Sequence, residues 1–286
     1  MEFFRRLIGR EAPAAATASS ACPKVPSVPS RLEVGWLTDV GRVRDHNEDS
    51  VLIVTGSSDG GEGMPSFGLL VLTDGMGGHQ AGEVASSIAA RVAAHHITHQ
   101  FYLPTLLNHA RNADQPALTE VLTDAVQAAN RAVSEEAPGS GTTLTCALIL
   151  GRQAYIAHVG DSRAYILADG ELTRITHDHS VVDRLVESGQ LTRDEAAVHP
   201  QKNVLYRAVG QSSEVEVDTH VRQIRPGAYL LLCSDGLWGL VNDADMVAII
   251  ENASSLQGAC QDLVAIANEA GGRDNIAVIL WHSPLG

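Results

Sequence analysis

The sequence predicts an α+β fold in which packed antiparallel sheets are flanked by helices. Strand-like apolar segments follow one another in groups, and so do the helical segments, whereas a doubly wound parallel sheet would alternate them one by one. No internal repeat is present. Hydrophobic residues make up 44% of the 286 residues and charged residues 19%, which is enough apolar material for a core in one large domain or two small ones.

Residues 1–30 differ in composition from the rest of the chain. Residues 11–30 are rich in Ala, Ser and Pro and contain almost no large apolar side chains, which is typical of a flexible linker. We therefore expect residues 1–30 to form a flexible N-terminal extension and residues 31–286 to form the folded domain. The alternative is a short amphipathic docking helix within the first ten residues, formed by Phe3, Phe4, Leu7 and Ile8.

The first part of the folded domain is expected to contain two strands, two helices and then more strands. Val51–Thr55 and Phe67–Thr73 are short apolar runs that end in polar turns, so they are predicted to be buried strands. Ala81–Phe101 is predicted to be helical, and so is Pro116–Glu136, where apolar residues recur three and four positions apart after a proline. Four further strands are predicted at Thr142–Leu150, Gln153–Val159, Arg163–Leu167 and Glu171–Ile175.

A more polar segment then interrupts the strands. Residues 176–212 contain two short helical pieces, Val181–Glu187 and Arg193–Ala197, and are predicted to be an insertion that stands over one end of a sheet. Strands and helices return after it. These are the strands Val215–Val221 and Tyr229–Cys233, the helices near Ala244–Glu251 and Leu256–Ala270, and the strand Asn275–Trp281.

The net charge of −14, from 20 basic and 34 acidic residues, argues against nucleic acid as a partner and against charge-driven attachment to anionic lipid. No apolar run reaches the length of roughly 18–20 residues that a membrane span needs. The four cysteines lie far apart without a CxxC pair, which is typical of a reduced, cytoplasmic protein. The excess acid either keeps the protein in solution or includes a carboxylate cluster that needs cations.

Four aspartates lie in or beside glycine-containing turns at the ends of the most apolar strands: Asp74, Asp161, Asp235 and Asp274. One such residue usually marks a turn, but four of them can converge on one rim of a sandwich. Converging carboxylates raise one another's pKa or bind a cation. Carboxylate oxygens without a Cys/His cluster favour Mg²⁺ or Mn²⁺ over Zn²⁺, and two such ions about 3.5–4 Å apart form a phosphoester-hydrolysis centre.

The charged segment Gly41–Ser50 contains further groups that such a centre needs. Arg44 offers a planar fork that matches a phosphate group, and Glu48 and Asp49 supply carboxylates. Neighbouring strand residues point to opposite faces, so at most one of the two acids is expected to bind a metal directly unless a bulge intervenes. The alternative for this segment is an ordinary solvated run of charges.

Seven motifs follow one another along the chain: Arg44…Asn47-Glu48-Asp49, Asp74-Gly75-Met76-Gly77-Gly78-His79…Gly82-Glu83, Gly141-Thr142-Thr143, Gly160-Asp161-Ser162-Arg163, Asp178-His179-Ser180, Ser234-Asp235-Gly236-Leu237 and Gly272-Arg273-Asp274-Asn275. In this order they make the chain resemble the metal-dependent serine/threonine protein phosphatases of the 2C type, the PPM family, in their bacterial form. The resemblance covers about residues 32–282.

The resemblance implies a four-layer αββα sandwich with two Mn²⁺ or Mg²⁺ ions at one end of the paired sheets. By matching position, Asp74 is expected to bridge both ions, and the Gly75 carbonyl to bind one of them. Asp235 and Asp274 would complete the first metal site.

The same resemblance implies roles for residues around the two ions. Glu48 would serve the second ion directly or through water, with Asp49 behind it. Arg44 would hold the substrate phosphate. Asp161 matches the ligand of a third, weaker ion, and residues 176–212 match the mobile flap, from which Asn203 could reach that ion.

Two positions depart from the pattern of the family. Met76 stands where eukaryotic relatives have a histidine, so the general acid is either a metal-bound water or, less favoured, His79, which could equally cap the following helix. Gly239 stands where many relatives have an aspartate that helps to hold the third ion. His177 and His179 are spaced like a metal-binding pair, but packing within the flap is the favoured interpretation.

The implied activity is hydrolysis of phosphoserine and phosphothreonine in protein substrates, by attack of a metal-bridging hydroxide. The expected setting is a cytoplasmic monomer that opposes a cognate serine/threonine kinase. The alternatives are a non-catalytic adaptor with the same fold, which the presence of Asp74, Asp235 and Asp274 disfavours, and a metal-dependent nuclease or small-phosphoester hydrolase, which the acidic charge disfavours.

Overall fold

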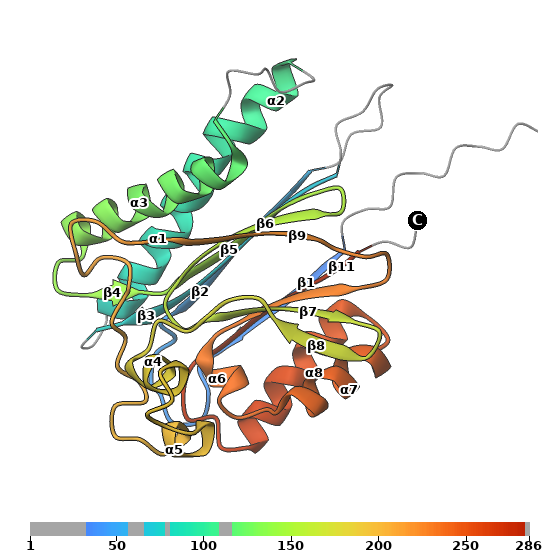
Figure 1. Ribbon diagram of the computed structural model, residues 1–286. Helices are drawn as coiled ribbons and strands as arrows, with labels where there is room; N and C mark the ends of the chain where they lie inside the picture. Colours follow the sequence, from blue (N-terminus) through green and yellow to red (C-terminus); the bar gives the residue numbers. More distant parts are fainter. Residues whose placement is uncertain (1–32, 57–65, 78–80, 109–115, 284–286) are drawn as a thin grey trace, which may run out of the picture.

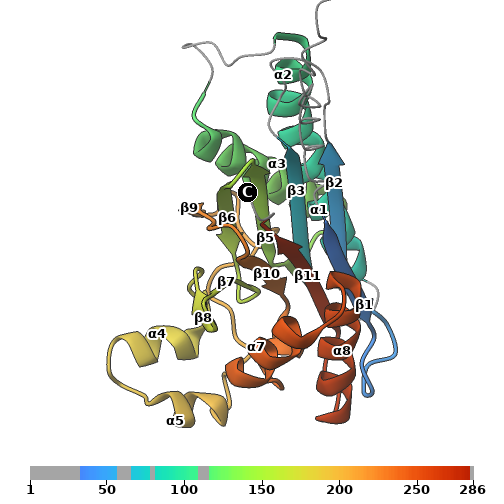
Figure 2. The same ribbon diagram turned by 90° about the vertical axis from the view of Figure 1, so that its right-hand side faces the viewer.

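The computed structural model describes residues 33–56, 66–77, 81–108 and 116–283 (Figure 1). Two antiparallel sheets lie face to face, and helices cover the outer face of each (Figures 1 and 2). The predicted αββα sandwich is therefore confirmed. Both the proposed N-terminal extension, residues 1–30, and His79 lie outside the described residues.

The first sheet has six strands, and each pair of neighbours in it is antiparallel. The order is β2-β3-β5-β6-β9, and the short β4 pairs with the end of β3. Their bounds are β2 Asp49–Gly56, β3 Phe67–Met76, β4 Gly141–Thr142, β5 Leu144–Leu150, β6 Gln153–Val159 and β9 Asp218–Gln223.

The second sheet has five strands in the order β1-β11-β10-β7-β8, again antiparallel throughout. It joins the two ends of the described chain, because Val34 in β1 faces Trp281 in β11. The bounds are β1 Val34–Asp39, β7 Arg163–Ala168, β8 Glu171–Arg174, β10 Tyr229–Cys233 and β11 Ile276–His282.

Helices form the two outer layers and the insertion. Helix α1 (Ala81–Ile97) continues through a π-helical turn, Thr98–Tyr102, into α2 (Leu103–Asn108), and with α3 (Leu118–Glu136) it covers the six-stranded sheet. The five-stranded sheet is covered by α6 (Asp235–Trp238), α7 (Asp243–Asn252) and α8 (Leu256–Glu269). Helices α4 (Val181–Glu187) and α5 (Arg193–Ala197) stand beyond one end of the sheets, as predicted for the insertion (Figure 1).

Three apolar cores separate the four layers, and β3 shows why. Leu69 and Val71 pack among residues of α1 and α3, whereas Leu70 and Leu72 pack against the other sheet. Successive strand residues point to opposite faces, so a strand buried on both faces reads as a continuous apolar run. The third core lies between the five-stranded sheet and its helices.

The element predictions missed three short pieces and misplaced one. β1, α2 and α6 were not predicted, and the strand expected at Val215–Val221 begins at Asp218 instead. The reason is that Gln127 of α3 binds the backbone of Val215 with its side-chain amide, so Val215 is tied to a helix rather than to a strand. Among the described residues, no helix is long and apolar enough to cross a membrane.

Candidate metal centre

Asp74 and Asp49 lie opposite each other in neighbouring strands of the six-stranded sheet. The backbone N–H of Asp74 donates to the Thr143 hydroxyl at 2.9 Å, and its carbonyl accepts from the N–H of Thr143 and from the hydroxyl of Thr142. The Asp49 side chain is buried, with 7% of its surface exposed. Two carboxylates are therefore fixed side by side at the end of one sheet.

Asp235 and Asp274 come from the other sheet. Asp235 follows β10 and Asp274 precedes β11. Because these two strands are antiparallel neighbours, the two aspartates lie at the same end of the sheet. Ser234 joins this end of the second sheet to the first sheet, since its hydroxyl donates to Asp49 Oδ2 at 2.7 Å and accepts from the N–H of Ala277 at 2.8 Å. The four carboxylates thus lie at the same end of the two packed sheets.

Asn275 holds the chain between β1 and β2 against the same end of the sheets. Its side-chain amide donates to the carbonyls of Val40 and His46 at 3.0 and 2.8 Å, and its carbonyl oxygen accepts from the N–H of Glu48 at 2.8 Å. One buried side chain therefore sets the path of the segment that contains Arg44 and Glu48.

Glu48 and Arg44 stand at the rim of a cavity of about 210 Å³. The Glu48 carboxylate lies over Gly82 in the first turn of α1, where a Cβ would come within 2.7 Å of it. A Cβ on Gly75 would lie 2.2 Å from the Gly82 carbonyl oxygen, so only glycine allows this approach of strand and helix. The cavity is lined by Arg44, Glu48, Asp74, Gly75, Met76, Gly77, Thr143, Asp161, Asn203, Leu205, Asp235 and Asp274.

Arg44 is already in contact with one of the predicted ligands. Its Nη2 donates to Asp274 Oδ2 at 2.7 Å, which raises the pKa of the Arg44 guanidinium. Its side chain is 47% exposed.

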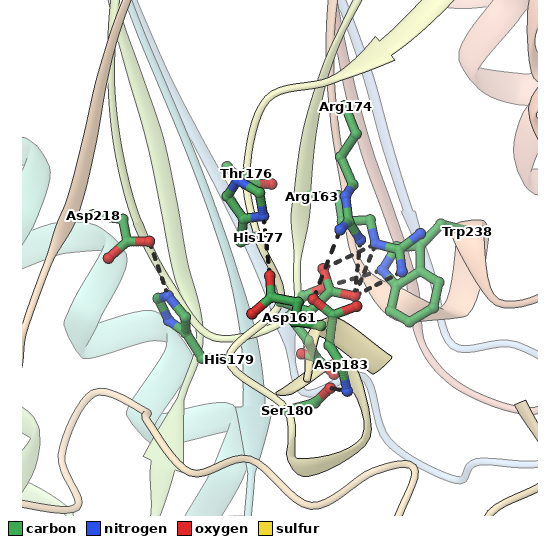
Figure 3. A network of polar contacts seen from close by, with 12 residues as sticks. Asp161, Arg163, Arg174, Thr176, His177, His179, Ser180, Asp183, Asp218 and Trp238 are labelled. Atoms are coloured by element: carbon green, nitrogen blue, oxygen red, sulfur yellow. Dashed lines mark hydrogen bonds and ion pairs between the residues drawn. The ribbon is translucent and has the colours of Figure 1, made fainter. Parts of the chain in front are cut away.

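Asp161 is buried beside a stacked network at the base of the insertion (Figure 3). The indole N–H of Trp238 donates to the Asp161 carbonyl at 3.0 Å, and the Arg163 guanidinium lies 3.4 Å from the centre of the Trp238 ring. Arg163 also grips Asp178 with two nitrogen atoms, at 3.0 and 2.6 Å. Strand β7, helix α6 and the insertion are thereby fixed relative to Asp161.

The carboxylates of the cluster resist ionisation. Burial raises the pKa of Asp49 to about 8 and that of Asp235 to about 6, and neighbouring acidic charges add to both shifts. The pKa of Asp74 is raised well above its ordinary range by burial and then by the charges of Asp49, Asp235, Asp161 and Asp274. Burial also raises the pKa values of Asp161 and Glu48. A bound cation would relieve all of these penalties at once.

The donor set fits a hard divalent ion. Asp49 Oδ1 is buried and has no hydrogen-bond partner, and the other donors at the cavity are carboxylate and carbonyl oxygens. No three His, Cys, Asp or Glu side chains within the described ranges are grouped closely enough to hold one ion by themselves. Mg²⁺ needs only one or two carboxylates because it keeps several waters, so the residues present suit it.

The remaining predicted residues lie in different places. Asn203 lines the cavity, as does Met76. The buried His179 accepts the Gly160 N–H with Nδ1, and its Nε2 lies 3.2 Å from Asp218 Oδ2, whereas the His177 side chain is exposed near Glu187 (Figure 3). The two histidines therefore do not form a pair, and His179 packs within the fold.

The sequence interpretation assigned no role to three residues that hold the site together: Ser234, Asn275 and Trp238. The first two stand inside recognised motifs, so their presence was visible but their partners were not. The available signal for Ser234 was a small hydroxyl residue between a buried strand and an Asp-Gly pair, which is typical of a helix N-cap position.

Comparison with known proteins gives one consistent result. Residues 37–276 match the family model described as protein phosphatase 2C. The serine/threonine phosphatase stp of Listeria monocytogenes is 37% identical over 257 residues, which cover 89% of this chain and 97% of that protein. The protein phosphatase PhpP of Streptococcus pneumoniae is 36% identical over 250 residues, which cover 87% and 96%.

Solved structures agree with these relatives. The serine/threonine phosphatase PstP/Ppp of Mycobacterium tuberculosis has a TM-score of 0.73 at 35% identity, with 89% of this chain and 100% of that chain covered. The catalytic domain of PstP in complex with two manganese ions has a TM-score of 0.71 at 35% identity, with 88% and 98% covered.

Proposed function

Because the chain belongs to the protein phosphatase 2C family of metal-dependent hydrolases, we propose that it removes phosphate from phosphoserine and phosphothreonine in proteins at a two-metal centre. The observation that carries this proposal is the meeting of carboxylates from both sheets in one cavity, with an arginine at its rim. The raised pKa values of Asp49, Asp74 and Asp235 favour bound Mn²⁺ or Mg²⁺ over unneutralised charges at this end of the sheets.

The proposed ligands divide between two ions. Asp74 would bridge them, the Gly75 carbonyl would bind one, and Asp235 and Asp274 would complete the first site. The manganese complex of PstP supports the number of ions. The cavity, which has all four residues in its lining, supports the assignment.

Glu48 would bind the second ion directly or through water. Asp49 would lie behind Glu48 and support the site without binding the ion. Asp49 is supported in this role by its hydrogen bond from Ser234, which orients one carboxylate oxygen and leaves the other without a partner. Asp161 would hold a third, weaker ion, and Asn203 lines the same cavity.

The bound ions would lower the pKa of a water molecule for in-line attack on phosphorus and would neutralise the charge of the phosphate. Arg44 would orient the phosphate through the N–H groups that Asp274 does not use, since a guanidinium has five. The thioether of Met76, which lines the cavity, has no proton to give, so the leaving alkoxide would take its proton from water.

We also propose a setting for this activity. The substrates would be phosphorylated proteins supplied by a serine/threonine kinase in the same compartment, which the sequence predicts to be the cytoplasm. The insertion at residues 176–212 would act as a flap that governs access, because its residues Asn203 and Leu205 line the cavity of the metal centre.

The test is turnover of a phosphothreonine peptide with Mn²⁺, and again after EDTA. We expect hydrolysis with Mn²⁺ and none with EDTA. Asp74→Asn should lower kcat by at least about 10²–10³-fold, the cost of losing one strong transition-state contact, while the circular dichroism spectrum is unchanged. Asp124→Asn, an exposed position on α3, is the matched control. A metal-replete enzyme without turnover would refute the proposed function.

A further inference from the structure

A second cavity adjoins the candidate metal centre on the side of the insertion. It measures about 290 Å³ and lies among residues of α4, α5 and α6 and of the loop before β11. Four of its residues also line the cavity of the metal centre: Asp161, Asn203, Asp235 and Asp274. The residues of a substrate that flank a phosphate at the metal centre therefore lie close to this second cavity.

Part of the charge in this second cavity is already neutralised. Arg163 and Arg174 both bind Asp178, and Arg174 also lies 3.7 Å from Asp183 (Figure 3). Bound metal ions would neutralise the carboxylates that this cavity shares with the metal centre.

Three cations of the same cavity remain without a partner. Within the described part of the chain, the side chains of Arg193, Lys202 and Arg273 make no ion pair and no hydrogen bond, although acidic residues outnumber basic ones by 34 to 20. Glu195, one of the two acids in the helix of Arg193, accepts hydrogen bonds from the backbone N–H and the hydroxyl of Thr192.

Apolar side chains make up the rest of the lining: Val182, Val186, Ala196, Trp238 and Leu240. The three cations are exposed, so their attraction to an incoming anion is screened by salt. The apolar lining provides contact for the aliphatic part of a side chain. The cavity thus combines an apolar wall with three free positive charges, which suits an acidic group on a carbon stem.

We propose that this cavity selects substrates that have a second anionic group beside the phosphorylated residue, a carboxylate or a second phosphate, and that Arg193, Lys202 and Arg273 bind it. The inference rests on the proposed function, because it assumes that a phosphorylated peptide occupies the metal centre. An extended peptide advances about 3.4 Å per residue, so residues two and three positions from the phosphorylated residue lie about 7–10 Å from it and are the positions to test.

The experiment compares kcat/KM for phosphothreonine peptides with Asp or Ala placed two or three residues before or after the phosphothreonine. We expect one Asp position to be preferred over Ala by about tenfold, which is 1.4 kcal/mol, and the preference to shrink as salt is added. A peptide with phosphoserine in place of that Asp identifies the source of the anion. A preference for it alone assigns a second phosphate, and a preference for both shows that a carboxylate suffices.

The double variant Arg193→Gln/Arg273→Gln should bring the Asp/Ala ratio close to one. Because the ratio is internal to each variant, a general loss of activity cancels. Lys202 stays unchanged, since its charge also acts on Asp235. The matched control is Arg152→Gln, an exposed arginine in the turn between β5 and β6, which should keep the preference.

Hydrolysis of para-nitrophenyl phosphate by the unmodified enzyme separates the two proposals, because this substrate has no flanking residues. Normal turnover of it together with equal kcat/KM for all peptides would overturn the inference and leave the proposed function intact. A double variant that keeps its preference would also overturn it. No turnover of either substrate would refute the proposed function and the inference with it.

Discussion

Arg44, the candidate for binding phosphate, contacts Asp274, a candidate metal ligand. Arg44 and a metal ion would therefore compete for the same carboxylate. Arg44 donates one N–H to Asp274, and its half-exposed side chain leaves the other donors free at the rim of the cavity. A metal ion on Asp274 would weaken that contact and a phosphate would replace it. Loading of the centre is therefore expected to move Arg44 from the protein toward the substrate.

The first residue-level prediction concerns Arg44→Ala. A charged hydrogen bond contributes about 1.5–3 kcal/mol, so kcat/KM should fall by roughly 10–150-fold. The thermal midpoint should change little because the side chain is half exposed. Arg42→Ala, an exposed arginine in the same loop, is the control and should keep full activity. Steady-state kinetics on one phosphopeptide decide the matter, and an unchanged kcat/KM would remove Arg44 from the site.

The sequence identifies the acidic residues of the site more readily than the residues that hold them. Asp74 and Asp235 stand next to glycine at the ends of apolar runs, and such a local pattern is visible in the sequence. Ser234 matters because it meets Asp49, which lies 185 positions away, and Asn275 because it meets the loop before β2. Those partners depend on how the two sheets pack, which no local pattern encodes.

At the scale of elements, Asn275 is the link between β11 and the chain that joins β1 to β2. We expect Asn275→Ala to lower the free energy of unfolding by about 2–3 kcal/mol. The substitution removes three hydrogen bonds and leaves the backbone groups that made them without a partner. Mn²⁺ affinity should fall as well, since Glu48 loses its anchor. Urea unfolding and a metal titration measure the two effects.

Asn252→Ala is the matched control for that experiment. Asn252 ends α7 on the surface and binds only the carbonyl of Ala248 in its own helix. The control should therefore change the free energy of unfolding by less than about 0.5 kcal/mol. If Asn275→Ala behaves like this control, the loop before β2 does not depend on Asn275.

Clear local signals decided which elements were predicted well. Apolar residues mark β6 and β10, and a hydroxyl residue at the N-cap, Ser180 or Thr192, precedes each of α4 and α5. β1 contains a glycine and has one buried residue in six, and α6 is only four residues long, so neither gives a periodic signal. Contacts with distant segments define both of them.

For the whole molecule, the carboxylate cluster makes stability depend on pH and on metal. The pKa of Asp235 rises from 3.8 to about 6 and that of Asp49 to about 8, so both groups hold protons more tightly in the folded state. Their contribution to stability is present in full below about pH 4 and is lost as the pH rises through 6 and 8. Metal ions that replace the protons should restore it.

We therefore expect the Tm of the metal-free protein to fall between pH 6 and pH 8.5, and saturating Mn²⁺ to remove that fall. Differential scanning calorimetry with EDTA and with Mn²⁺ across this range provides the measurement. Asp49→Asn should flatten the metal-free profile because it deletes the carboxyl whose pKa is raised to about 8. A metal-free Tm that stays level or rises over this range would contradict the proposed cluster.

The pairing of β1 with β11 has a consequence for the growing polypeptide on the ribosome. Strands β2, β3, β5 and β6 follow one another along the chain and can assemble early, but β1 must wait for β11, which is made last among the described strands. Asp235 and Asp274 reach their places only through β10 and β11. The nascent chain therefore cannot assemble the candidate metal-binding end of its sheets until β11 has left the ribosome.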